Sequence, residues 1–372
     1  MRIVPLDRLN KQQMRDFIRF PWQVYKCDSF WVPPLLAEIR DKLDERKNPF
    51  FKYGKIKLFL AYGENKKILG RVAAIINPLH EKIYNESAGF FGMFECTNDV
   101  SVARDLFAAA LENLKENDCT TMIGPVNFTT NDESGLLLEG NADCPSFMSN
   151  YCPSYYHTLL TESGFSKSID TLCYETTIGH KFPDKFFRVK EIIASDPAVS
   201  IHYFRKNKAI EDILLIRKIY NESFKGTWGF IPMTDPESED LAEKFMAFAD
   251  FKLIWIACYE GKPAGMILAI PDINEIIRKL NGHLYPFGFL RFIFERRHLK
   301  RYRVVALGIL PEYRRMGIET LLIHKVRDRM YEAGYQRAEF SVVMENNKRM
   351  RNLLESFGFR LSKRYRLYKM EI

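Results

Sequence analysis

The chain has 372 residues and a net charge of +8, and 47% of its residues are hydrophobic, 14% aromatic and 27% charged, as in a folded protein of about two domains. It contains no run of about 18 apolar residues and begins with charged residues, which excludes a membrane-spanning helix and argues against a signal peptide. Seven scattered cysteines without a Cys-x-x-Cys pair, and seven histidines without metal-ligand spacing, predict reduced thiols, a cytoplasmic protein and no bound metal.

Residues 1–50 are predicted to form an N-terminal arm that packs on a first domain through two apolar segments, 20–22 and 31–34. The first domain is predicted at residues 51–180, and residues 181–198, which include two prolines, are predicted to be a linker. The elements expected in the first domain are a hairpin at 59–76, a strand at 88–96, a helix at 101–117, a strand at 120–128 and a helix at 153–162.

A second domain is predicted at residues 199–372. Its helix at 318–333 is well defined, because Ile318, Leu322 and Val326 recur at helical spacing and Gly334 ends it. The other elements expected there are a strand at 199–205, helices at 209–224 and 238–248, a hairpin at 252–271, a strand at 302–310, a strand at 336–343, a helix at 347–357 and a strand at 364–371.

An internal repeat supports this division. The segments Leu159–Phe165 and Leu353–Phe359 share a Leu-Leu start and a Gly-Phe end, and they stand 194 positions apart. The hairpins at 59–76 and 252–271 precede them in the same order. Two copies of one domain explain the match better than chance, and the mixture of hairpins and helices predicts an α+β fold with mixed sheets.

The positive charge lies in the second half of the chain. Residues 1–178 contain 20 Lys and Arg against 23 Asp and Glu, whereas residues 179–372 contain 35 against 24. The densest run, residues 278–303, has eight basic residues and one acid, Glu295, interleaved with aromatic residues. Such a half suggests an anionic partner, such as a phosphorylated cofactor, a membrane surface or nucleic acid, with a solvated surface as the alternative.

The segment that carries chemistry runs from Leu307 to Leu322. It predicts a strand, a tight loop rich in arginine and a helix that starts at a glycine, Gly317. The first N–H groups of a helix have no partner within the helix and form an anion site. Arginine strengthens such a site, and glycine lets a phosphate approach the backbone. The pattern therefore predicts phosphate binding, with an ordinary helix cap as the alternative.

Here the sequence resembles the GNAT superfamily of N-acyltransferases. The family's acyl-CoA signature, Arg/Gln-x-x-Gly-x-Gly/Ala after a strand, is matched by Arg314 and Gly317, with Pro311 before them. A second signature, an Asn eleven residues before a Gly-Phe pair, is matched by Asn347 and Gly358-Phe359. The resemblance implies tandem GNAT-like domains, each a mixed central sheet flanked by helices. It also implies transfer of an acyl group, acetyl or longer, from coenzyme A to a primary amine by direct attack on the thioester.

The resemblance further implies a cofactor site in the second domain. Acetyl-CoA or another acyl-CoA would bind with its pantetheine arm along Leu307 and Ile309 and with Asn347 as a further contact, for which a helix N-cap is the alternative. The loop residue Arg314 belongs to the same site. The pyrophosphate would bind the amides of Arg315, Met316, Gly317, Ile318, Glu319 and Thr320.

Two positions depart from the family pattern. Glu319 stands where the family has a small residue, so it either opposes the phosphate, points away and holds Arg315, or has a chemical role. Leu354 stands where many members have a tyrosine that protonates the leaving thiolate. Tyr365 and Tyr368 are substitute candidates, with core packing as the alternative. The catalytic candidates are therefore Glu319 and Tyr365.

The first half also resembles a GNAT domain, but one without a coenzyme A loop. Its strand-to-helix connection at 94–100 contains acids and no Arg-x-x-Gly, so we expect no coenzyme A there. The polar loop at 124–135 is either a wall of the substrate site or a capped structural loop. With its segments 31–34 and 48–51, the whole chain resembles bacterial two-domain GNAT-like proteins, a resemblance that brings no substrate.

Two other functions stay open at this point. One is a non-catalytic acyl-CoA-binding module, and the other is an aminoacyl-tRNA-dependent transferase with a tandem GNAT fold. The intact loop at Arg314 argues against the second, so nucleic acid is not expected as a partner. Residues 281–303 combine aromatic and cationic parts, which suits an anionic membrane surface and a cytoplasmic protein peripheral to the inner face of the membrane. The alternative is that the aromatic residues pack in the protein.

Overall fold

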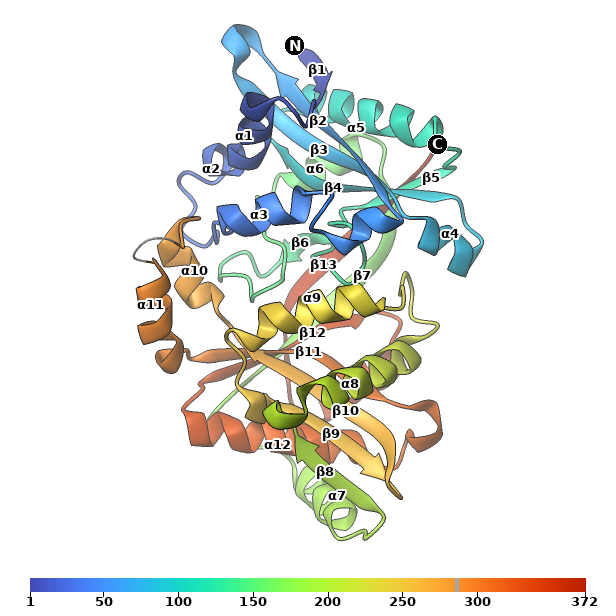
Figure 1. Ribbon diagram of the computed structural model, residues 1–372, viewed down its shortest axis with the longest axis vertical. Helices are drawn as coiled ribbons and strands as arrows, with labels where there is room; N and C mark the ends of the chain where they lie inside the picture. Colours follow the sequence, from blue (N-terminus) through green and yellow to red (C-terminus); the bar gives the residue numbers. More distant parts are fainter. Residues whose placement is uncertain (285–287) are drawn as a thin grey trace. The chain divides into compact units, whose positions relative to one another are not determined.

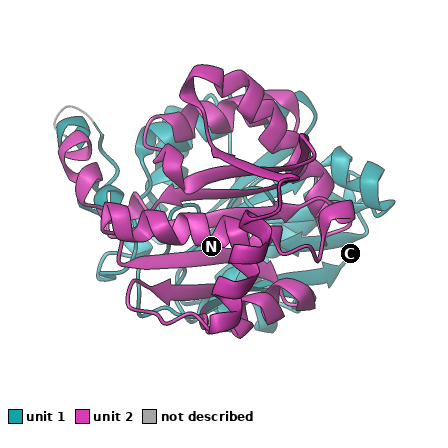
Figure 2. Ribbon diagram, turned by 90° about the horizontal axis from the view of Figure 1, so that it is seen from below, with its two compact units in different colours: residues 1–171, 276–290, 363–372 teal, residues 172–275, 291–362 magenta. Residues whose placement is uncertain are grey.

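The computed structural model describes residues 1–284 and 288–372 and divides into two compact units (Figure 1). The first unit consists of residues 1–171, 276–290 and 363–372, and the second of residues 172–275 and 291–362, shown in different colours in Figure 2. Neither unit is continuous in sequence. Two long strands, β7 (Ser166–Thr177) and β13 (Arg360–Glu371), begin in one unit and end in the other.

The first unit contains a sheet with the strand order β1-β2-β3-β4-β5-β13, and β6 also pairs with β13. The helix α5 (Val100–Lys115) packs on β2 and β3 through Val102, Leu106 and Ala110, which are buried. The other elements of this unit are β1 (Arg2–Pro5), α1 (Lys11–Arg19), α2 (Pro21–Val24), α3 (Leu36–Leu43), β2 (Lys55–Tyr62), β3 (Ile68–Ile76), α4 (Pro78–Tyr84), β4 (Ala88–Cys96), β5 (Thr121–Gly124), β6 (Leu136–Glu139) and α6 (Tyr156–Glu162).

The second unit contains a sheet with the strand order β7-β12-β11-β10-β9-β8. Strands β8, β9, β10 and β11 pair with one another in antiparallel, whereas β11 and β12 are parallel and are joined by the helix α12 (Ile318–Ala333). The other elements are α7 (Asp184–Ala194), β8 (Val199–Tyr203), α8 (Ala209–Phe224), α9 (Asp235–Met246), β9 (Ile254–Tyr259), β10 (Lys262–Pro271), β11 (Arg301–Ile309), β12 (Arg337–Met344) and α13 (Lys348–Ser356).

Helices cover both faces of this second sheet. On one face, Ile219 of α8 packs with Met266 and Ala306 of the strands, and α8 and α9 stand in front of the sheet in Figure 1. On the other face lies α12, since the Tyr302 hydroxyl of β11 donates a hydrogen bond to the Val326 carbonyl of α12 at 3.4 Å. Because side chains alternate along a strand, residues 303 and 302 of β11 point to opposite faces.

The predicted α+β architecture is confirmed, and the helix expected at 318–333 has those bounds in the structure. Two predictions of elements need correction. The strand expected at 120–128 ends at Gly124, since Pro125 follows and has no N–H for a strand ladder. Residues 184–194, for which no element was predicted, form α7, because Phe186 is fully buried there against His324 and Phe357.

The basic aromatic segment between β10 and β11 is helical. It contains α10 (Asn274–Leu280) and α11 (Gly288–Glu295), followed by a short turn of 3₁₀ helix at Arg296–His298. Tyr285 and Phe287, two of the aromatic residues in the run 278–303, lie outside the described residues.

Candidate functional site

Strands β11 and β12 of the second unit form a fork. They pair in parallel only from Arg301 to Val304, opposite Arg337 to Phe340, although β11 continues to Ile309 and β12 to Met344. Within the described residues, the edge of β11 that faces away from β10 therefore has no strand partner beyond Val304. This open edge contains Leu307 and Ile309, and its N–H and C=O groups can pair with an extended, amide-containing ligand.

The N-terminus of α12 follows directly from the open end of this fork. Gly317 caps the helix with a φ of +88°, and Arg315 has a φ of +74°, so the loop turns its N–H groups into a concave array. In the described part of the chain, the main-chain N–H groups of residues 315–319 have no acceptor, whereas that of Thr320 donates to the Gly317 carbonyl at 2.9 Å. Five successive unpartnered donors at the start of a 16-residue helix can bind an anion.

Packing as well as ligand approach requires glycine at position 317. A Cβ atom there would lie 2.8 Å from Cγ1 of Val189 and 3.2 Å from Cγ1 of Ile193, both on α7. A positive φ is also costly for any other residue. Glycine at position 317 is therefore required both by the anion-binding loop and by the packing of α7 against it.

Arg314 braces the loop from inside. Its Nε donates to the Ile309 carbonyl at 3.3 Å and its Nη2 donates to the Ser223 carbonyl of α8 at 3.0 Å. The guanidinium thus ties the end of β11 to α8 and contributes positive charge at the open end of the fork. Both Arg314 and Arg315 are exposed as whole residues.

Glu319 points away from Arg315 and pairs with another arginine. Its Oε1 accepts a hydrogen bond from Nη2 of Arg349, in the first turn of α13, at 3.1 Å. The Glu319 side chain is about 10% exposed and that of Arg349 is 44% exposed, while Oε2 of Glu319 is buried without a hydrogen-bond partner among the described residues. The expectation that Glu319 holds Arg315 is wrong, because α13 brings a cation closer.

The other predicted residues fall into two groups. Asn347 is the N-cap of α13, since its Oδ1 accepts a hydrogen bond from the Met350 N–H at 3.1 Å, and Leu354 of α13 is fully buried. Tyr365 belongs to the first unit, where it is 2% exposed and lies opposite Leu137 of β6. The structure therefore gives Asn347 a capping role and places Tyr365 in a different unit from Glu319.

Sequence reasoning missed a buried polar chain at the base of the fork. Nε of Arg303 donates to the Ser341 hydroxyl at 2.8 Å, and that hydroxyl donates to Oε1 of Glu339 at 2.9 Å. All three side chains are at most 5% exposed, and they lie on the face of the sheet opposite α12. Buried charges are costly unless they are paired. Charged residues inside strands that are otherwise apolar were the signal that could have found them.

The corresponding strand edge in the first unit is occupied by the protein's own side chains. Strand β4 pairs with β5 only from Ala88 to Phe90. Beyond that point the Cys96 N–H donates to the Tyr156 hydroxyl at 2.8 Å, and the Cys96 carbonyl accepts from the Tyr155 hydroxyl at 2.8 Å. The Met93 N–H donates to Oδ1 of Asn127 at 2.9 Å. This edge is therefore closed to a ligand.

A carboxylate is buried behind these tyrosines. Glu95 Oε2 accepts hydrogen bonds from the hydroxyls of Tyr156 at 2.7 Å and Tyr25 at 2.9 Å, and Arg71 lies 3.8 Å from Oε1. Burial raises the pKa of Glu95, and the arginine and the two hydroxyls oppose that rise. Since the carboxylate is satisfied by side chains of its own unit, it is a structural group.

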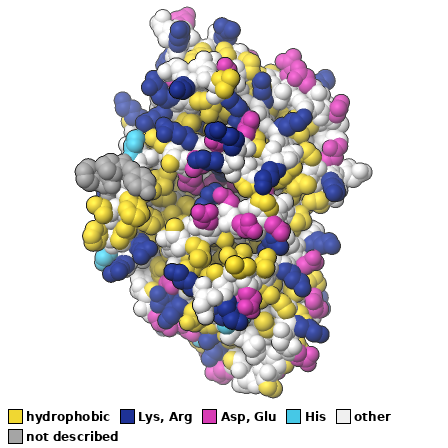
Figure 3. Space-filling view, in the orientation of Figure 1, with side chains coloured by type: hydrophobic (Ala, Val, Ile, Leu, Met, Phe, Trp, Pro, Cys, Tyr) yellow, Lys and Arg dark blue, Asp and Glu magenta, His cyan; other side chains and the backbone are white. Residues whose placement is uncertain are grey.

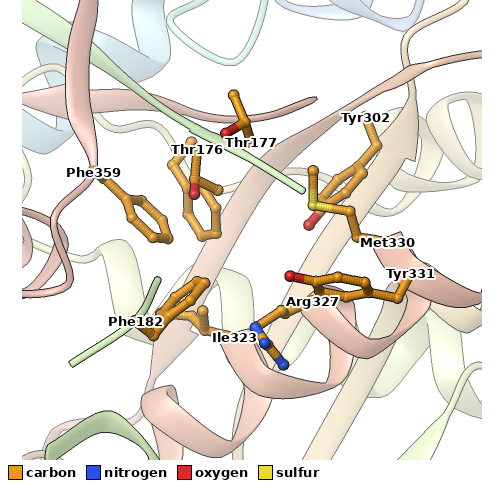
Figure 4. A pocket seen from close by; sticks show the side chains of 10 residues that line it. Thr176, Thr177, Phe182, Tyr302, Ile323, Arg327, Met330, Tyr331 and Phe359 are labelled. Atoms are coloured by element: carbon orange, nitrogen blue, oxygen red, sulfur yellow. The ribbon is translucent and has the colours of Figure 1, made fainter. Parts of the chain in front are cut away.

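A small pocket in the second unit lies away from the fork. It lies between α12 and the sheet, where Arg327 and Tyr331 approach Phe182 and Tyr302 (Figure 4). The Arg327 guanidinium stacks on the Phe182 and Tyr331 rings, and half of the lining residues are aromatic. We regard this pocket as a packing gap beneath α12.

Neither a metal centre nor a membrane span is found in the ranges 1–284 and 288–372. No helix there combines the length and the hydropathy that crossing a bilayer requires. His, Cys, Asp and Glu side chains in those ranges form no group of three that could hold a metal ion.

Comparison with known proteins places the chain in a family. A sequence model of the acetyltransferase (GNAT) family matches residues 213–359. The chain is 31% identical over 375 residues to protein YghO of Escherichia coli K12, covering 98% of this chain and 94% of that protein. It is 29% identical over 365 residues to the bacterial ceramide synthase of Caulobacter vibrioides, covering 96% of this chain and 94% of that enzyme.

Solved structures share the fold. A tandem GNAT protein from the clavulanic acid biosynthesis pathway matches with a TM-score of 0.58 at 11% identity, covering 100% of this chain and 98% of that one. A GCN5-related N-acetyltransferase from Sphaerobacter thermophilus matches with a TM-score of 0.51 at 12% identity, covering 84% and 80% of the two chains. The chain therefore belongs to the GNAT acetyltransferase family and has two GNAT-like domains.

Proposed function

We propose that this protein is an acyl-CoA-dependent N-acyltransferase whose thioester site is the fork of the second unit. The observation that carries the proposal is the row of five unpartnered N–H groups at residues 315–319 beside the open edge of β11. A dianionic pyrophosphate suits the first feature, and the amide-containing pantetheine arm suits the second. The two features lie at one end of one strand, as a single elongated ligand requires.

Only the second unit is proposed to bind coenzyme A. In the first unit, hydroxyls of Tyr155 and Tyr156 already satisfy the main chain of Cys96. Asp99 also places negative charge at the start of α5, where its carboxylate accepts from the Ser101 N–H at 2.8 Å. Where a carboxylate of the chain itself already accepts from the first N–H groups of a helix, those groups are not available to bind a phosphate.

The reaction proposed at the fork is attack of a neutral primary amine on the thioester carbon, which forms the C–N bond of an amide and breaks the C–S bond. Coenzyme A leaves as a thiolate, which takes up the proton that the nitrogen loses. The amine must lose a proton, and the carbonyl oxygen must be stabilised as it gains charge. Open N–H groups on β11 beyond Val304 are suited to the oxygen. We propose that Glu339 accepts the proton that the amine loses, or pairs with the amine while it is still an ammonium ion. Glu339 stands beside the last paired position of β11 and β12, and its Oε1 accepts a hydrogen bond from Ser341.

The acceptor we propose is a long-chain amine, with a long-chain acyl-CoA as donor. This rests on the similarity to the bacterial ceramide synthase, which extends over 96% of the chain. Ceramide is the amide of a fatty acid and a long-chain amino alcohol, so its synthesis is N-acylation of a lipophilic primary amine. The same chemistry fits the fork, which takes a thioester and an amine.

Calorimetry with coenzyme A tests the site. Arg315→Glu should weaken binding about tenfold or more, because it puts a negative charge beside the proposed pyrophosphate. The substitution keeps a non-glycine residue at a φ of +74°, so the backbone strain is unchanged. Lys206→Glu, an exposed position elsewhere in the same unit, is the matched control and should leave affinity unchanged.

Thiol release from acetyl-CoA and from a long-chain acyl-CoA, each with small and long-chain primary amines, tests the reaction. Amine-dependent release together with an amide product in mass spectrometry supports the transferase. Tight binding without turnover would instead indicate an acyl-CoA-binding module. If the protein binds no coenzyme A, the result would favour the aminoacyl-tRNA-dependent reaction instead.

A further inference from the structure

The helix α11 (Gly288–Glu295) has an apolar surface that is partly exposed among the residues the structure describes. None of its residues is buried, and Phe294 is 71%, Leu290 52%, Phe289 44% and Ile293 36% exposed. Adjacent exposed apolar side chains on one short helix are unusual on a protein surface and mark an interaction site. The alternative from the sequence, that these side chains are buried in the protein, does not hold for Phe294 and Leu290, which are more than half exposed.

The apolar residues are segregated from the polar ones. At about 100° per residue, Phe289, Leu290, Phe292, Ile293 and Phe294 occupy one continuous arc of about 200°. Arg291 and Glu295 lie on the other side, where they form an ion pair at 2.7 Å. The charged groups on the polar side of α11 thus pair with each other, and the side chains on the apolar side are partly exposed to solvent.

Positive charge follows this apolar arc directly. Arg296, Arg297 and Lys300 are exposed, and Arg296 donates a 3.5 Å hydrogen bond to the Ala247 carbonyl. Within the described residues, these three side chains form no ion pair. Figure 3 shows the hydrophobic patch over α11 at the left edge of the molecule, with Lys and Arg side chains near it.

We propose that α11 and the basic turn after it dock this protein on the surface of an anionic lipid bilayer. A helix whose aromatic face is flanked by arginine and lysine can insert its apolar side at the level of the headgroups while the cations contact phosphate. Charge complementarity selects an anionic surface over a neutral one. The docking itself does not depend on the proposed reaction; only its purpose, access to amphiphilic substrates that reside in the bilayer, rests on the proposed function.

Co-sedimentation with phosphatidylcholine vesicles, with and without phosphatidylglycerol, tests the docking. The wild type should sediment with the anionic vesicles at low salt and be released at high salt. Two variants separate the contributions: Arg297→Glu with Lys300→Glu removes the cations, and Phe289→Ser with Phe294→Ser removes apolar anchors. Each double variant should bind at least tenfold more weakly, since a basic residue near such a surface and a buried aromatic ring each contribute substantially.

Matched controls use equally exposed residues on other elements. Lys55→Glu with Lys57→Glu on β2, and Ile210→Ser with Leu214→Ser on α8, change the same charge and comparable apolar surface. Both should bind vesicles as the wild type does. All variants should keep the wild-type affinity for coenzyme A in calorimetry, which checks folding and separates this proposal from the proposed function.

Three results would overturn the docking proposal. The first is a wild type that does not sediment with anionic vesicles at low salt. The second is α11 variants that sediment as well as the controls. The third is a dimer in light scattering that Phe289→Ser with Phe294→Ser turns into a monomer, which would make a second copy of the chain the partner of α11.

Discussion

Glu319→Gln tests how a carboxylate can stand in the first turn of an anion-binding helix. At about 5 Å and an effective dielectric of about 20, an unopposed carboxylate would cost a bound phosphate about 3 kcal/mol. Its removal would then tighten coenzyme A by more than about a hundredfold. In the structure, however, Arg349 lies 3.1 Å from Glu319 Oε1, so the pair presents little net charge to the loop.

We therefore expect Glu319→Gln to leave the coenzyme A dissociation constant within about threefold of the wild type. The cost should appear in stability instead. Because Arg349 is 44% exposed, its ion pair is screened and contributes about 0.2–1 kcal/mol. An acid at a helix N-terminus adds about 0.3–1 kcal/mol. Urea unfolding should show a loss of about 1 kcal/mol in the free energy of unfolding.

The reciprocal change isolates the charge of Glu319. Arg349→Met should weaken coenzyme A at least about tenfold, because it leaves the carboxylate unopposed and removes a cation. The double variant should return to within about threefold of the wild type, which is a coupling between neighbours. Glu312→Gln, an exposed acid in the same loop, is the control and should have no effect.

Two outcomes would refute this reasoning. One is a hundredfold tightening by Glu319→Gln alone, which would mean that Arg349 does not neutralise the carboxylate. The other is a fall in kcat of about a hundredfold or more at unchanged affinity, which would give Glu319 the proton-transfer role considered from the sequence.

Three further predictions follow from the contacts. Glu339→Gln should lower kcat by about a hundredfold with coenzyme A affinity unchanged, measured by thiol release and calorimetry; unaltered kcat would remove Glu339 from the reaction. Gly317→Ala should destabilise the second unit by at least about 1–2 kcal/mol, since its φ is +88° and its Cβ would meet Val189, and urea unfolding of Gly317→Ala with Val189→Ala should recover part of that loss. Tyr156→Phe removes a hydroxyl that lowers the already raised pKa of Glu95, so that pKa should rise further. The penalty for ionised Glu95 is fully present above its raised folded pKa, and it falls as pH drops from that pKa to the ordinary pKa of an unfolded glutamate. The loss of stability in urea should therefore be larger at neutral than at acid pH, and an equal loss at both would contradict the sign.

The local features of this protein could be predicted from its sequence alone. The helix α12 has the predicted bounds because periodic apolar residues and Gly334 are signals contained within the segment. The same holds for the two hairpins and for the anion-binding loop, whose donors come from the backbone of consecutive residues. The α+β architecture followed from these local signals together with the internal repeat.

Tertiary structure decided which distant residues meet. The partner of Glu319 is Arg349, thirty positions away, and the neighbour of Gly317 is Val189 on a helix that the sequence did not reveal. The polar chain from Arg303 to Glu339 depends on strand register. Such contacts arise from the pairing and packing of separate elements, and no local periodicity encodes them. For the same reason, the exposure of α11 depends on which separate elements pack near it, and the sequence of α11 does not encode that.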